Sequence, residues 1–226
     1  MAVTDALCSA ATYRNIITKT DTGDDAAILT DLKAVSRFLE LKLGRFFTQD
    51  AAAVDRIYRV PSPRSAPPLN WAESENPWKY GNVARILYVD DIASTTGLTI
   101  KVDEDSDGSF SDESAWATTD YELWPENAPL GPEPAPYTAI AIPEWSSKGA
   151  FYANQRVQVH AIFGYPSVPP AIERAVAHLT GILRLESPRA TSRVNEMGEI
   201  MSTSKQARDI IEQLTRQYRK TVGVAI

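Results

Sequence analysis

The sequence predicts an α+β fold: a three-helix bundle with an antiparallel β-sheet or sandwich domain inserted between helices 1 and 2. Apolar residues recur at helical spacing near both ends of the 226-residue chain, whereas the middle consists of short β-branched or aromatic runs. All five tryptophans and eleven of the fifteen prolines also lie within that middle part. We therefore predict a discontinuous helical domain, residues 1–49 and 164–226, and an inserted β domain at residues 50–163.

The first helix is predicted at residues 24–47. Its apolar side chains recur at steps of three and four residues, at Ile28, Leu32, Val35, Leu39, Leu43 and Phe46. Asp24 and Asp25 favour the N-terminus through capping and the helix dipole, and Gly44 weakens the last turn. The spacing therefore predicts one amphipathic helix with a firm start.

Six strands are predicted in the middle part, at residues 54–60, 84–92, 98–102, 120–124, 137–142 and 156–163. In the last of them polar and apolar side chains alternate, which indicates one buried and one solvent-facing side. Two long proline-rich connections, residues 61–82 and 125–136, are predicted to be contact arms, because loops of that length are usually functional. Trp116 and Trp124 are assigned to the core of the sheet.

Helical spacing returns after the last strand. Pro169 and Pro170 are tolerated in a first turn and begin a second helix that runs to about Leu185. Residues 187–201 are interpreted as a polar connector, and a third helix follows at residues 203–218. Three amphipathic helices cannot each bury an apolar stripe alone, so we expect them to pack together.

Charge differs among the three parts of the chain. Residues 1–49 carry six acidic and six basic residues, residues 50–163 carry seventeen and eight, and residues 164–226 carry six and nine. An acidic insert is thus combined with a basic C-terminus within a net charge of −6, which argues against general coating of nucleic acid. With 43% hydrophobic and 23% charged residues and no apolar run of about 20 residues, we expect an intracellular globular protein with no membrane partner.

The acidic segment 103–108 (DEDSDG) begins like a calcium loop, with alternating oxygen ligands and a turn glycine. Position twelve of such a loop, where a bidentate glutamate closes the coordination shell, is Ser114, and Glu113 stands one place early. We therefore predict a solvated hairpin turn and no metal site, with calcium at Asp103, Asp105 and Asp107 as the alternative.

Motifs for catalysis are absent from the sequence. His160 and His178 lie outside any paired metal-ligand spacing, and the sequence has no nucleophile elbow and no phosphate-binding loop. Cys8 is the only cysteine and is expected in a mobile N-terminal stretch, so an intramolecular disulfide is excluded. We therefore predict a protein that is not an enzyme and holds no cofactor.

Several segments, in their order, carry a resemblance to a known family. They are residues 32–47 (LKAVSRFLELKLGRFF), 100–110 (IKVDEDSDGSF), 119–125 (TDYELWP), 157–175 (VQVHAIFGYPSVPPAIERA) and 204–220 (SKQARDIIEQLTRQYRK). Together they resemble the head-to-tail connector or adaptor proteins of long-tailed bacteriophages and gene transfer agents. The strongest segment is 157–175, where a strand ends in an aromatic, glycine, aromatic, proline step before a helix opens. The proline-rich arms have no counterpart in that pattern.

The resemblance implies a structural protein of the virion that forms a ring, expected to be a dodecamer, beneath the portal protein. It would extend the DNA channel, touch the passing genomic DNA transiently and join the capsid to a stopper or tail-completion protein. Its location would be the head-tail interface of the virion, and the host cytoplasm during assembly. The alternative function is a ligand- or ion-binding β module on a helical scaffold, and an enzyme without a recognisable motif ranks third.

Three sets of residues are assigned to contacts in that role. An acidic loop would repel DNA phosphates and let the genome slide, a basic helix end suits an acidic portal surface, and tryptophan is enriched in interface hot spots. The sets are Arg216, Tyr218, Arg219 and Lys220 for portal binding, Trp71 and Trp78 for contact with a neighbouring subunit, and Asp103, Asp105 and Asp107 for the channel-facing loop.

Overall fold

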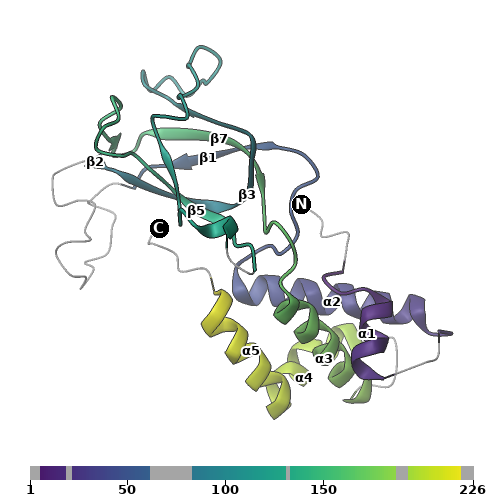
Figure 1. Cartoon of the computed structure of the whole chain (residues 1–226). Helices are drawn as coiled ribbons and strands as arrows, with labels where there is room; N and C mark the ends of the chain where they lie inside the picture. The colour runs from purple at the N-terminus through teal and green to yellow at the C-terminus, as the bar shows by residue number, and fades with distance from the viewer. Residues whose placement is uncertain (1–5, 19–21, 62–82, 131–132, 187–192, 220–226) are drawn as a thin grey trace. The chain divides into compact units, whose positions relative to one another are not determined.

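The computed structural model describes residues 6–18, 22–61, 83–130, 133–186 and 193–219 (Figure 1). Contacts within the chain divide it into two compact units. The helical unit comprises residues 1–48 and 167–220, and the β unit comprises residues 49–166. Each unit is described by itself below.

Among its described residues the helical unit has five helices, so the predicted three-helix bundle is wrong. They are α1 (Ala10–Ile17), α2 (Asp25–Leu43), α3 (Pro170–Glu186), α4 (Arg193–Thr203) and α5 (Lys205–Tyr218), with two helices before the sheet and three after it (Figure 1). The helices that the sequence did not predict are the two shortest, α1 and α4, of 8 and 11 residues. Helices this short give little periodic signal, and packing within the unit supplies most of their stability.

A local cap marks the start of α1, and buried side chains anchor both short helices. The Ser9 side chain caps α1 by accepting a hydrogen bond from the Thr12 N–H at 3.0 Å. Tyr13 of α1 is buried, as are Ile200 and Met201 of α4. Each short helix therefore contributes its few apolar side chains to the core of the helical unit.

Helix α2 forms the predicted apolar stripe but ends earlier than predicted. Ile28, Leu32, Val35, Leu39 and Leu43 are all buried. Gly44 then takes a left-handed conformation (φ 64°), and its N–H donates to the Glu40 carbonyl, which ends the helix. Phe46 is consequently 40% exposed, whereas the next residue, Phe47, is fully buried and packs edge-on against Tyr218 with ring centroids 5.8 Å apart.

A buried ion pair joins α2 to α3 in the helical unit. The Asp31 side chain is 5% exposed, and its Oδ2 accepts a hydrogen bond from Arg184 Nη1 at 2.7 Å. Arg184 Nη2 also donates to Asp24 Oδ2 at 3.2 Å. One guanidinium thus bridges two carboxylates of the neighbouring helix.

The β unit contains a five-stranded antiparallel sheet in the order β1-β7-β3-β5-β4 and a separate two-stranded pair, β2-β6 (Figure 1). The strands are β1 (Val54–Arg59), β2 (Val83–Ala84), β3 (Ile86–Val102), β4 (Glu122–Trp124), β5 (Tyr137–Ala141), β6 (Phe151–Tyr152) and β7 (Arg156–Phe163), and a 3-10 turn spans Ala128–Leu130. Strand β3 is continuous where two strands were predicted. Register shifts between Tyr88 and Thr99 let its first half pair with β5 and its second half with β7.

The core of the β unit lies on one side of the sheet. Strand β7 shows the predicted alternation, since Val157, Val159, Ala161 and Phe163 are buried and the residues between them are partly exposed. Trp116 stacks on Phe151 with ring centroids 5.4 Å apart, which confirms its assignment to the core. Trp124 is 43% exposed, so its assignment to the core is wrong. It stands on β4, the short edge strand, on the face opposite to the core.

No helix within the described ranges has both the length and the apolar character that crossing a membrane requires.

The acidic loop as a candidate functional site

The acidic loop, residues 103–113, follows strand β3 directly and contains six carboxylate side chains. Asp103 continues the pairing of β3 with β7, because its N–H donates to the Arg156 carbonyl at 3.0 Å. Beyond the loop, the Trp116 N–H donates to the Ile100 carbonyl at 2.8 Å. One end of the segment is therefore hydrogen-bonded to β7, and the chain beyond its other end is hydrogen-bonded to β3.

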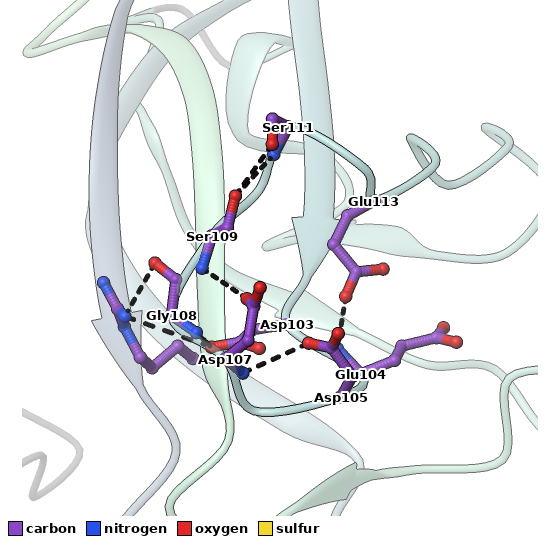
Figure 2. Close-up of polar contacts among 9 residues, drawn as sticks. Asp103, Glu104, Asp105, Asp107, Gly108, Ser109, Ser111 and Glu113 are labelled. Atoms are coloured by element: carbon purple, nitrogen blue, oxygen red, sulfur yellow. Dashed lines mark hydrogen bonds and ion pairs between the residues drawn. The ribbon is translucent and has the colours of Figure 1, made fainter.

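Side-chain carboxylates fold the loop by capping its own backbone (Figure 2). Asp107 N–H donates to Asp105 Oδ1 at 3.1 Å, Ser109 N–H donates to Asp107 Oδ1 at 2.6 Å, and Gly108 N–H donates to Asp103 Oδ2 at 3.2 Å. Such contacts are the reason aspartates at alternate positions favour turns. The DEDSDG pattern thus dictates the local shape of the loop.

Gly108 is required at its position for two reasons. Its φ of 86° lies in the left-handed region, and a Cβ there would stand 2.6 Å from Arg156 Nη1. The Arg156 guanidinium occupies that space because it donates to the Gly108 carbonyl at 3.0 Å. The same guanidinium lies over the ring of the buried Phe110, and Lys101 Nζ donates to the Phe110 carbonyl at 2.7 Å. The far side of the loop is thereby attached to the sheet.

The loop brings carboxylates together in two overlapping groups. One oxygen each from Asp103, Asp105 and Glu113 lie within 4.8 Å of one another, and so do one oxygen each from Asp105, Asp107 and Asp112. Figure 2 shows Glu113 reaching from the far end of the loop toward Glu104, whose N–H donates to Glu113 Oε1 at 2.6 Å. Two unit charges about 4 Å apart repel by about 1 kcal/mol in bulk water and by about 4 kcal/mol near a protein surface. The arrangement therefore favours a cation.

Asp103 is the buried member of the acidic loop. Its side chain is 2% exposed, its Oδ2 lies 4.0 Å from Arg156 Nη1, and its buried Oδ1 has no hydrogen-bond partner. A buried carboxylate oxygen without a partner is uncommon, since desolvation without compensation is costly. This oxygen is the least satisfied part of the loop.

Of the predicted channel-facing residues, Asp105 and Asp107 are exposed and Asp103 is buried. Sequence reasoning set Glu113 aside and missed Asp112, because it compared the segment with a loop that ends in a helix and requires an acid at position twelve. Here the chain leaves the loop toward a strand, so that spacing does not apply. The adjacent acidic residues Asp112 and Glu113, shortly after the turn, were the signal in the sequence that could have identified them.

The predicted portal-binding residues have different environments. Arg216 and Arg219 are exposed on and just after α5, and Arg216 pairs with Glu212 one turn earlier. Tyr218 is buried against Phe47, so its ring belongs to the core of the helical unit. Lys220 lies outside the described residues, as do Trp71 and Trp78, the predicted contacts with a neighbouring subunit.

The three residues considered for catalysis, Cys8, His160 and His178, have different environments. Cys8 is buried, and burial together with the charge of Glu173 raises the pKa of its thiol to about 11, so it stays protonated at neutral pH. His160 pairs with Asp55 at 2.7 Å across strands β7 and β1, and His178 is exposed on α3.

The comparisons with known proteins give no family for this chain. No model of a protein family matches it, and no curated protein matches it. Inference about function therefore rests on the order of the sequence segments and on the surfaces of the two units.

Proposed function

We propose that the protein is a structural component of a virion, a head-to-tail adaptor that forms a ring beneath the portal. In this role it extends the DNA channel and joins the capsid to the stopper or tail, at the head-tail interface. The order of sequence segments resembling that family supports the proposal. The observation that carries it is that the subunit offers two surfaces of different chemistry, one suited to a neighbouring subunit and one suited to the portal protein.

The first surface is an aromatic pair on the β unit. Tyr88 of β3 and Trp124 of β4 both stand opposite Ala139 of β5, so the two rings flank a small residue on one face of the sheet. Each of the two aromatic residues is 43% exposed. Exposed large aromatic side chains beside one another are typical of interface anchors. We assign this pair to contact with a neighbouring subunit.

The second surface is the charged face of α5 in the helical unit. Ala207, Leu214 and Tyr218 are buried on one side of the helix, which leaves its basic residues toward solvent. Arg216 and Arg219 suit an acidic surface on the portal protein because guanidinium groups bind carboxylates in a bidentate manner. The portal contact is assigned to these two residues.

The acidic character of the β unit suits a channel wall that releases DNA. Asp105 and Asp107 are exposed, and fixed negative charge repels phosphates, so passing DNA would slide without being held. The proposal needs no reaction and no cofactor. Its ring is expected to contain twelve subunits.

Electron microscopy of the purified protein, alone and mixed with its portal protein, tests the proposal, with light scattering to measure mass. Rotationally symmetric rings in either sample are expected. Trp124→Ala should weaken ring formation, whereas Trp145→Ala is a matched control, because Trp145 is 74% exposed and lies outside the aromatic pair. A protein that stays monomeric and does not bind the portal would exclude the adaptor function.

The portal contact has a separate test. Arg216→Glu combined with Arg219→Glu should reduce portal binding at least tenfold while leaving ring formation unchanged, since salt-dependent charge pairs carry the contact. Lys205→Glu, at the opposite end of α5, is the control and should bind the portal like the wild-type protein. If the double change left portal binding unaffected, the assignment of α5 to the portal contact would be wrong.

A further inference from the structure

The buried oxygen of Asp103 indicates a ligand that the chain does not supply. Asp103 Oδ1 is buried and has no partner, and Asp103 is one of three residues whose carboxylate oxygens lie within 4.8 Å of one another. The other two, Asp105 and Glu113, approach from the more exposed side of the loop. An acidic cluster with a fully buried, unsatisfied member differs from an ordinary solvated turn, where every carboxylate reaches water.

Two basic side chains contact the loop, and each also makes contacts outside the group formed by Asp103, Asp105 and Glu113. Arg156 donates to the Gly108 carbonyl and covers the Phe110 ring, and its Nη1 remains 4.0 Å from Asp103 Oδ2. Lys148 stands 3.8 Å from Glu104 and lies over the ring of Trp116. Of these two, only Arg156 pairs with the group formed by Asp103, Asp105 and Glu113, at the long distance of 4.0 Å, so one positive charge faces three carboxylates.

The chemistry of the donors selects the kind of ion. All three side chains offer carboxylate oxygens, which are the ligands of hard cations, and no histidine or cysteine belongs to the group. Calcium accepts six to eight oxygens in flexible geometry, whereas magnesium requires a near-ideal octahedron. A loop whose ligands come from both of its ends fits the less demanding ion.

We propose that the acidic loop binds one calcium ion through Asp103, Asp105 and Glu113. The ion would meet the unsatisfied Asp103 oxygen and relieve the repulsion among the three carboxylates. It would also tie the start of the loop to its end, because Asp103 and Glu113 lie ten positions apart. The backbone contacts made by Asp105 and Asp107 hold the turn in shape before the ion arrives. This site goes beyond the adaptor function and does not depend on it.

Isothermal titration of the chelator-treated full-length protein with calcium chloride tests the site. One ion per chain is expected, with a dissociation constant on the order of 10⁻⁴ M or tighter and with magnesium at least tenfold weaker. Asp103→Asn and Glu113→Gln should each weaken calcium binding at least tenfold. Both keep the shape of the side chain, and circular dichroism would establish that each variant is folded.

Asp112→Asn is the matched control, because Asp112 is exposed and belongs to the other group of carboxylates. Its affinity for calcium should stay within about threefold of the wild-type value. The proposal is overturned if the wild-type protein binds no calcium at about 1 mM, or if folded Asp103→Asn and Glu113→Gln bind it normally. It is also overturned if Asp112→Asn alone abolishes binding, since the ion would then occupy the exposed group.

Discussion

Both units bury aspartate side chains, and Asp31 of the helical unit and Asp103 of the β unit differ in their partners. Asp31 in the helical unit accepts a hydrogen bond from Arg184 at 2.7 Å. Asp103 in the β unit stands 4.0 Å from Arg156 and keeps one buried oxygen without a partner. The chain therefore supplies a close partner for the buried charge of Asp31 and only a distant one for that of Asp103. Partners, more than burial, distinguish a structural carboxylate from a candidate ligand.

Glu40 of α2 is also a buried carboxylate, and its environment differs from those of Asp31 and Asp103. Its Oε1 accepts a hydrogen bond from the Phe47 N–H at 3.1 Å, while its buried Oε2 has no partner. Burial raises the pKa of this carboxyl, and the Phe47 hydrogen bond and the charge of Arg37 only partly oppose that effect. Unlike Asp103, Glu40 belongs to neither of the carboxylate groups found in the described part of the chain. Protonation of its carboxyl, without a metal ion, is therefore enough to reduce the cost of burying it.

The largest effect is expected from Arg184→Ala. Removing the guanidinium leaves Asp31 buried with its strongest partner gone, which should lower the free energy of unfolding by about 3 kcal/mol. Chemical denaturation followed by far-ultraviolet circular dichroism measures it. Arg216→Ala is the control, because its exposed pair with Glu212 contributes no more than about 0.5 kcal/mol. Equal effects of the two changes would contradict the importance given to the buried pair.

A smaller and pH-dependent effect is expected from Glu40→Gln. A raised pKa means that the folded protein holds the Glu40 proton more tightly than the unfolded chain, so stability decreases as pH rises above about 4.5 until folded Glu40 also ionises. The glutamine cannot ionise, and its carbonyl can still accept the Phe47 hydrogen bond. Denaturation at several pH values measures the free energy of unfolding of both proteins. As pH rises, the value for the variant should increase relative to that of the wild type by on the order of 1 kcal/mol. A constant difference would show that Glu40 ionises normally.

The smallest effect is expected from Asp103→Asn in calcium-free buffer. The amide oxygen can still accept the Gly108 hydrogen bond, and the lost attraction acts over 4.0 Å, so the free energy of unfolding should change by less than about 1 kcal/mol. Asp31→Asn should cost more, because it removes the negative charge that faces Arg184 at 2.7 Å. If denaturation gave the same cost for both, the contrast between the two aspartates would be lost.

Elements with strong periodicity could be predicted from the sequence, and short or bent ones could not. The stripe of α2, the start of α3 and the alternation in β7 follow from residue spacing, because each element buries one continuous face. Helices α1 and α4 are only 8 and 11 residues long, which is too short for a periodic pattern to stand out. Strand β3 was divided into two, because the polar residues at its bend resemble a loop and only its two partners reveal that it is continuous.

The candidate site was predicted in part. The turn chemistry of residues 103–108 is local, so the sequence by itself determined that aspartate side chains and Gly108 would form a tight acidic loop. Tertiary structure alone decided that Asp103 is buried beside Arg156 and that Glu113 returns to the start of the loop. Burial and the approach of distant side chains depend on how strands pair and pack, and the sequence spacing of a single loop does not contain that information.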